Sequence, residues 1–232
     1  MERLGIDEII HACRAVPFNC DNVGYIHGIA TDSRKLQQGD LFVALKGENF
    51  DGHEFAAAAV KAGAALVLSQ YKLGDDLPYL LVEDTLKALH NLAKYYKSKF
   101  KIPFVAVTGS SGKTTTKDII AAVLSAKYNV LKTEGNYNNE IGLPLTLFRL
   151  DGKHHICVLE MGMSSLGEIE VLADIVRPQA GVITNVGTAH IENLKTRENI
   201  LKAKMELFTY FTPENTAIIN GDNDMLKTVT HK

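Results

Sequence analysis

The stretch V-A-V-T-G-S-S-G-K-T-T-T-K, residues 105–117, decides the fold of the surrounding chain. It reads as a buried apolar strand, then a tight Gly/Ser turn, then Lys113 and three threonines that begin a helix. Gly109 and Gly112 enclose only two residues, so the turn is shorter than the common G-x-x-x-x-G-K-[ST] pattern. Two interpretations follow: a phosphate-binding loop of a shorter type, or a glycine turn with a surface lysine. The strand before it and the helix after it favour the phosphate-binding loop.

The residue types in this turn suit a nucleotide. Glycines let the backbone approach a phosphate closely, and the start of a helix offers unpaired N–H donors and a positive dipole end. In such a site Lys113 reaches the β- and γ-phosphates, and the Thr114 hydroxyl holds Mg²⁺.

The chain that follows alternates between apolar strands and amphipathic helices. We expect strands at 104–107, 129–132, 155–160, 181–184 and 216–219, with helices at 113–126, 167–176 and 197–211. Continuous apolar strands that alternate with helices are typical of a parallel sheet covered on both faces.

The first hundred residues predict a smaller, mixed α/β domain. Strand-like runs bounded by Gly, Asp or Pro recur within residues 24–83, and an alanine-rich helix ends at Gly63. Asp84 is a candidate N-cap for an amphipathic helix over 84–100. A lysine-rich segment and Pro103 mark a boundary, so we expect domains at 1–101 and 102–232.

The bulk composition excludes several classes of protein. A net charge of −2 over 232 residues supplies no basic field for nucleic acid. No apolar run approaches the ~20 residues that span a bilayer, and the acidic N-terminus is not a signal peptide. The 3 cysteines lack metal-type spacing. We therefore expect a reduced, cytoplasmic protein that acts without nucleic acid or membrane.

Two polar residues follow the predicted strands at the edge where the glycine turn lies. Ligands of open α/β sheets bind beyond the carboxyl ends of the strands. The strand over 155–160 ends in Glu160, and His190 follows the strand over 181–184. A carboxylate and an imidazole beside a triphosphate suit a divalent metal, although each residue alone is more often a solvated or loop side chain.

One lysine falls on an apolar helical face. Helical spacing over 197–211 places Lys204 within a stripe of Ile200, Ala203 and Leu207, whereas Lys202 points the opposite way. Burial lowers the pKa of a lysine, and a neutral amine can react with CO₂ to give an anionic carbamate. Periodicity alone favours the simpler alternative, in which the stem packs inside and the charge reaches solvent.

Two polar loops complete the set of candidates. The segment T-E-G-N-Y-N-N-E-I-G-L-P-L-T, residues 133–146, is rich in asparagine, which serves either turns or a polar ligand. The segment T-D-S-R, residues 31–34, offers a hydroxyl and an arginine fork suited to a diphosphate, and alone it is more often a turn.

Together these segments resemble the Mur ligase family, the ATP-dependent amide ligases of peptidoglycan precursor synthesis. The resemblance covers essentially the whole chain. It is carried by TDSR (31–34), GDLFVALKGENFDGHEF (39–55), TGSSGKTTTK (108–117), TEGNYNNEIGLPLT (133–146), LEMGMSSLGEI (159–169) and GVITNVGTAHIE (181–192). The asparagine loop and the GMSSLGEI segment favour the member that joins D-alanyl-D-alanine to UDP-MurNAc-tripeptide over the one that adds the third residue.

The resemblance implies a role for each matching residue. Ser33 and Arg34 would bind the UDP-sugar substrate, and Asn136 and Asn139 would lie near the reacting ends of ATP and substrate. Glu160 and His190 would each bind Mg²⁺, and Lys204 would be a carbamylated lysine that also serves the metal. The catalytic set would then be Lys113, Glu160, His190 and Lys204. The ATP loop would comprise Thr108, Gly109, Ser110, Ser111, Gly112, Lys113, Thr114 and Thr115.

The resemblance also sets an expectation for the extent of the enzyme. Members of the family have a third, C-terminal ligase domain, so we expect the 232 residues alone to be an incomplete, monomeric and inactive part of a ligase. Alternatives remain: a related ligase that adds a different amino acid, a folate polyglutamate ligase or cyanophycin synthetase, or a non-catalytic module that binds a UDP-sugar.

Overall fold

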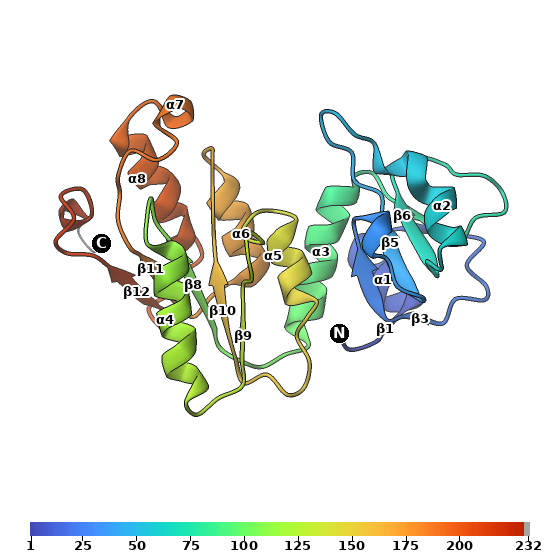
Figure 1. Cartoon of the computed structure of the whole chain (residues 1–232), viewed down its shortest axis with the longest axis horizontal. Helices are drawn as coiled ribbons and strands as arrows, with labels where there is room; N and C mark the ends of the chain where they lie inside the picture. Colours follow the sequence, from blue (N-terminus) through green and yellow to red (C-terminus); the bar gives the residue numbers. More distant parts are fainter. Residues whose placement is uncertain (230–232) are drawn as a thin grey trace. The chain divides into compact units, whose positions relative to one another are not determined.

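The computed structural model describes residues 1–229 and forms two compact units, Met1–Lys99 and Phe100–Lys232 (Figure 1). Each unit contains its own five-stranded sheet. No helix within residues 1–229 is both long and apolar enough to cross a membrane.

The N-terminal unit is built on a mixed sheet, as the sequence predicts. Its sheet has the order β2-β7-β6-β5-β4, in which β2 is antiparallel to β7 and the other neighbours are parallel. The strands are β1 (Leu4–Gly5), β2 (Val16–Phe18), β3 (Tyr25–Ile26), β4 (Gly28–Ala30), β5 (Asp40–Val43), β6 (Leu66–Ser69) and β7 (Tyr79–Leu81). The helices are α1 (Ile6–Cys13), η1 (Ser33–Lys35), η2 (Gly52–Phe55), α2 (Ala56–Lys61) and α3 (Thr85–Ser98).

Local sequence explains the helices of this unit. Asp84 is the N-cap of α3, because its Oδ1 accepts a hydrogen bond from the Lys87 N–H at 2.9 Å. The small side chains of α2 let it pack against the sheet, where Ala56 and Ala59 join Phe42 and Val67 in one apolar cluster. The short helix α1 was not predicted, since only two of its residues, Ile9 and Cys13, are buried.

The C-terminal unit is a fully parallel sheet. Its order is β12-β11-β8-β10-β9, with every neighbour parallel. The strands are β8 (Phe104–Thr108), β9 (Val130–Lys132), β10 (Ile156–Glu160), β11 (Ala180–Ile183) and β12 (Thr216–Ile219). The helices are α4 (Lys113–Ser125), α5 (Gly142–Leu147), α6 (Glu168–Val176), α7 (Ile191–Leu194), α8 (Arg197–Met205), η3 (Glu206–Phe208) and η4 (Leu226–Thr228).

Both faces of this sheet are covered. On one face α4 packs through Ala121 against Val107, Val158 and Val182 (Figure 1). Successive side chains alternate between the two faces of a strand. On the opposite face a Cβ added to Gly181 would lie 3.0 Å or less from side-chain atoms of Leu207, Phe208 and Phe211. The predicted architecture of a covered parallel sheet is therefore confirmed.

The last predicted helix is shorter than expected. The α-helix over 197–211 ends at Met205 and tightens into η3. The change occurs where the Glu206 carboxylate accepts N–H groups of Gly167 and Glu170 at the start of α6, at 2.8 and 3.3 Å. A carboxylate is stabilised at a helix N-terminus, and this contact fixes the residue at which α8 ends.

Candidate functional site

The glycine turn connects the carboxyl end of β8 to the first turn of α4. Lys113 is the first residue of α4, and its Nζ donates to the Gly109 carbonyl at 3.1 Å. Gly112 adopts a φ of +75°, a conformation that glycine takes at low cost. A Cβ at Gly109 would lie 1.9 Å from Thr184 Oγ1, so only glycine fits there. The turn thus leads into the N-terminus of a helix with a lysine at its first position, the arrangement that binds phosphates.

The end of β11 holds this turn in place. Asn185 Oδ1 accepts the Ser111 N–H at 2.9 Å, and its amide donates to Ser111 Oγ at 2.7 Å. Thr184 Oγ1 donates to the Ser111 carbonyl at 2.6 Å, and Gly187 N–H donates to Ser110 Oγ at 2.9 Å. Ser110 and Ser111 therefore serve to anchor the turn through their side chains, a role that spacing within the turn does not reveal.

Glu160 lies beside the turn, as its place at the end of β10 predicts. Glu160 pairs with Val107 of β8 in the sheet register. Its Oε2 accepts the Thr114 hydroxyl at 2.8 Å and its Oε1 accepts the Asn138 amide at 2.9 Å, while the residue is only 3% exposed. The structure thus brings Thr114 and Glu160 together, and it adds Asn138, which was not predicted.

The oxygen donors at this point fit a magnesium ion. Mg²⁺ prefers oxygen ligands and is usually bound by one or two carboxylates together with substrate phosphates and waters. Glu160 and Thr114 offer a carboxylate and a hydroxyl at the edge of the phosphate loop. Within residues 1–229 no group of three or more His, Cys, Asp and Glu side chains gathers into a metal site.

Lys204 lies within the apolar stripe of α8 that helical periodicity predicts, and it is buried there. The residue is 2% exposed, whereas Lys202 is exposed. Burial, and to a smaller extent the charge of Lys113, lowers the pKa of Lys204 to about 8. The interpretation in which its charge reaches solvent is wrong. A fraction of this amine is neutral near neutral pH and so able to act as a nucleophile.

His190 is not drawn into the cluster around Glu160. It precedes α7 with a φ of +63° and is half-buried. Its carbonyl accepts the N–H groups of Asn193 and Leu194 at 3.1 and 3.0 Å, which begins the short helix. The structure therefore shows a local backbone role for His190, and its role as a second metal ligand stays a prediction.

The two predicted asparagines are both exposed, and they differ in their hydrogen bonds. Asn139 Oδ1 accepts the N–H groups of Ile141 and Gly142 at 3.2 and 2.8 Å, so its side chain begins the turn into α5. Asn136 is exposed. A role near substrate stays a prediction for both residues, and Asn139 has a structural role as well.

The N-terminal unit places Ser33 and Arg34 in the short helix η1. The Arg34 guanidinium binds Asp32 through two hydrogen bonds, at 2.9 Å and 2.8 Å. This pair lowers the pKa of Asp32 to about 2, and the Arg34 side chain is 87% exposed. The Arg34 guanidinium, which was expected to bind a diphosphate, thus contacts Asp32 of its own loop and is exposed to solvent.

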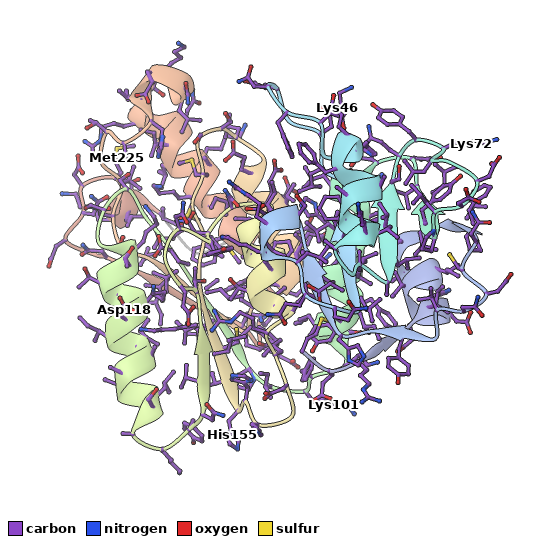
Figure 2. The ribbon with its side chains drawn as sticks, turned by 45° about the vertical axis from the view of Figure 1, so that its right-hand side comes forward. Lys46, Lys72, Lys101, Asp118, His155 and Met225 are labelled. Atoms are coloured by element: carbon purple, nitrogen blue, oxygen red, sulfur yellow. The ribbon has the colours of Figure 1, made fainter. Side chains whose placement is uncertain are left out.

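A second polar cluster of the same unit was not predicted. Asp51 Oδ1 contacts His53 Nδ1 at 2.5 Å, and His53 Nε2 accepts the Gln70 N–H at 3.1 Å. Lys46, labelled in Figure 2, donates to the Tyr71 hydroxyl at 3.1 Å. These contacts connect the segment Asp51-Gly52-His53 to the end of β6. The polar residues within 46–53 were the only feature of the sequence that could have indicated this cluster.

Two models of protein families match most of the chain. The Mur ligase middle domain matches residues 107–232, and the model described as Mur ligase family, catalytic domain, matches residues 25–97. These ranges correspond to the parallel-sheet unit and to most of the mixed unit.

Individual proteins are similar over the same length. UDP-N-acetylmuramoyl-tripeptide–D-alanyl-D-alanine ligases of Synechocystis sp. and Bacillus subtilis are 51% and 48% identical to the chain over 87% of its residues. The chain covers 45% of each of these proteins. It therefore spans about half the length of the curated relatives that it matches.

Solved structures agree with these matches. A crystal structure of MurF from Acinetobacter baumannii superposes with a TM-score of 0.93 and 35% identity, covering 97% of this chain and 50% of that one. The MurF ligase of Thermotoga maritima, crystallised in complex with ADP, has a TM-score of 0.81 and 40% identity over 87% of this chain and 47% of that one.

Proposed function

The chain belongs to the Mur ligase family, and from this premise we propose that it carries the UDP-sugar-binding and ATP-binding domains of a peptidoglycan precursor ligase. The whole protein would join D-alanyl-D-alanine to UDP-MurNAc-tripeptide with ATP. The observation that carries the proposal is the contact between Thr114 and Glu160 beside the phosphate loop. Relatives of that activity, at 51% and 48% identity, support the choice of substrate.

The proposed reaction has two steps. The terminal carboxylate of the tripeptide attacks the γ-phosphorus of ATP, so that an acyl phosphate forms and ADP leaves. The amine of D-alanyl-D-alanine then attacks the acyl carbon, and the tetrahedral intermediate loses phosphate and a proton to give the amide. Such reactions depend mainly on positioning and on neutralisation of phosphate charge.

The residues of the phosphate loop would do this work. The N–H groups at the start of α4 would bind the phosphate oxygens, and Lys113 would neutralise charge on the transferred phosphoryl group. A magnesium ion supplies further charge neutralisation when bound, and Thr114 and Glu160 would hold it. The relative from Thermotoga maritima was crystallised in complex with ADP, which supports the choice of an adenine nucleotide.

Lys204 would act in its carbamate form. Its lowered pKa makes the neutral amine available, and the nitrogen lone pair attacks CO₂ with loss of one proton. The product carries a negative charge beside Lys113, which would relieve the like-charge contact and add oxygen atoms near the metal-binding pair. His190 would contribute a second metal ligand.

Ser33 and Arg34 would contact the UDP moiety in the N-terminal unit, and Asn136 and Asn139 would lie near the reacting ends of the substrates. We propose a monomer that works in the cytoplasm, where ATP is available and the thiols of Cys13, Cys20 and Cys157 stay reduced. We also propose that residues 1–232 alone do not complete the ligation, since the relatives that catalyse it are about twice as long.

Calorimetric titration of the chain tests this proposal. UDP-MurNAc-tripeptide, UDP-MurNAc and tetrahydrofolate are added in parallel, each to protein whose folding has been checked by circular dichroism. We expect both UDP-sugars to bind and folate not to bind. Binding of folate alone would contradict the substrate, and amide formation by the chain alone would contradict the proposed incompleteness.

A further inference from the structure

A second buried lysine lies on the helix of the phosphate loop. Lys117 is 3% exposed and occupies the inner face of α4 together with Ala121. It lies one turn beyond Lys113, about 6 Å further along the helix axis. A buried ammonium is costly unless it is hydrogen-bonded or paired, so its partners indicate what it does.

The partner of Lys117 is a backbone carbonyl rather than a phosphate-binding group. Its Nζ donates to the Thr133 carbonyl at 2.9 Å and lies 3.4 Å from Asp118 Oδ1. Asp118, labelled on α4 in Figure 2, also binds Lys132 at 2.7 Å. The charge of Lys117 is therefore directed at the residue that follows β9.

Thr133 is tied to the end of β10 by two further hydrogen bonds. Its N–H donates to the Val158 carbonyl at 3.1 Å, and its Oγ1 accepts the Glu160 N–H at 3.0 Å. Thr133 is completely buried. Its N–H, carbonyl and hydroxyl are thus all engaged, and its hydroxyl contacts the backbone of the residue that carries the metal-binding carboxylate.

The same loop reaches the other side of Glu160. Five residues beyond Thr133, Asn138 donates from its amide to Glu160 Oε1 at 2.9 Å, and its carbonyl accepts the Gly162 N–H at 2.8 Å. The segment that begins at Thr133 therefore makes hydrogen bonds to both the backbone N–H and one carboxylate oxygen of Glu160.

We propose that Lys117 is a positioning residue, which holds Thr133 and through it places the Glu160 carboxylate against Thr114 for the metal-bound nucleotide. This inference rests on the proposed function. Lys117 itself touches neither nucleotide nor substrate in this scheme. Without its ammonium the Thr133 carbonyl becomes a buried acceptor with no charged donor, while the bond between Lys132 and Asp118 still joins β9 to α4.

The test compares Lys117→Met with Lys127→Met, which removes an exposed lysine just beyond the same helix. ADP binding is measured by calorimetry with and without Mg²⁺. We expect K117M to lose about tenfold in affinity for ADP with Mg²⁺, the effect typical of outer-sphere partners of a metal site. Affinity for ADP without metal should be unchanged, and Lys117→Arg, which keeps the charge, should restore most of the loss.

A structural measurement accompanies the binding experiment. Hydrogen exchange at the Glu160 amide, read by NMR, should quicken about tenfold in K117M because its bond to Thr133 Oγ1 loosens. Thr133→Val removes that acceptor directly. Exchange at the Glu160 amide in the double variant, K117M with T133V, should be no faster than in the faster of the two single variants. In Lys117→Gln the side chain is too short to reach the Thr133 carbonyl, so this variant should behave as K117M does. It replaces K117M in the experiment if K117M does not fold.

Three results separate the possibilities. Equal loss of ADP affinity with and without Mg²⁺ would overturn the inference, because Lys117 would then support the loop as a whole. Unchanged exchange at Glu160 in K117M would overturn it as well. Failure of the unaltered chain to bind ADP at all would contradict the proposed function instead, and exchange at Glu160 would then decide the role of Lys117.

Discussion

At the scale of a single residue, we expect Lys204 to make the free energy of unfolding depend on pH. Burial lowers its pKa from the ordinary 10.5 to about 8, so between these values the folded chain binds fewer protons than the unfolded chain. The free energy of unfolding therefore rises as the pH increases from 8 to 10. As the pH falls below 8, Lys204 becomes mostly charged in the folded chain. We expect Lys204→Met to be more stable than the parent there, by no more than about 3 kcal/mol.

The measurement is urea unfolding at several pH values in CO₂-free buffer, so that no carbamate forms. The advantage of K204M should shrink as the pH approaches 10. Lys202→Met removes an exposed lysine from the same helix and should leave the stability within about 0.5 kcal/mol of the parent. A stability difference for K204M that stays constant from pH 7 to 10 would contradict the lowered pKa.

Residues that depend on local periodicity could be predicted, and those that depend on distant pairing could not. Lys204 is found from helical spacing alone, and Lys117 could have been found from its i, i+4 relation to Lys113. Asn138 and Thr133 gain their roles only when β9 and β10 pair. For Arg34 a local contact was overlooked: its guanidinium binds Asp32, and this contact competes with the diphosphate that the T-D-S-R segment suggested.

At the scale of an element, the proposed nucleotide site depends on the phosphate loop. A Cβ at Gly109 would lie 1.9 Å from Thr184 Oγ1 and 3.3 Å from the Asn185 nitrogen, so Gly109→Ala must move the loop or the end of β11. We expect ADP binding to weaken by about tenfold or more, equivalent to at least ~1.4 kcal/mol. Calorimetry measures this loss. Gly221→Ala, where nothing lies within 4 Å of the added carbon, should bind as the parent does.

The turn before α5 tests whether Asn139 is structural. Its Oδ1 accepts two backbone N–H groups, so Asn139→Ala should lower the free energy of unfolding by about 1 kcal/mol, as the loss of a capping side chain does. Asn139→Asp keeps the acceptor and should retain most of the stability. Chemical denaturation measures both, with Asn136→Ala as the exposed control. Unchanged stability of N139A would leave substrate binding as its role.

Elements with strong apolar runs were predicted to within one or two residues, and three short helices were missed. The strands β8 to β12 and the helix α4 follow directly from apolar periodicity. The helices α1, α5 and α7 have 8, 6 and 4 residues, too few for a clear period. The end of α8 depends on Glu206 binding at α6, which is a contact between elements that a local pattern does not contain.

At the scale of the whole molecule, the sheet topology explains which of the predicted site residues lie together. The parallel sheet places β8, β10 and β11 side by side, so their carboxyl ends bring the phosphate loop, Glu160 and Thr184 together. That Glu160 lies at the same edge of the sheet as the phosphate loop could be predicted, because both follow the carboxyl ends of predicted strands. The mixed sheet of the other unit has its own core and its own loop with Ser33 and Arg34, and we therefore expect the two proposed ligand sites to respond separately to substitution.

That independence gives a prediction for paired variants. Arg34→Met removes the fork in the N-terminal unit, and we expect it to weaken binding of UDP-MurNAc while ADP binding stays within twofold of the parent, about 0.4 kcal/mol. Gly109→Ala should show the opposite pattern, because its clash lies in the parallel-sheet unit. Lys35→Met removes an exposed charge next to Arg34 and serves as the control for general electrostatics. Calorimetry of both ligands against all three variants measures the pattern. Loss of UDP-MurNAc binding in G109A, with the protein folded, would show that uridine recognition depends on the phosphate loop and would contradict the assignment of the two ligands to separate units.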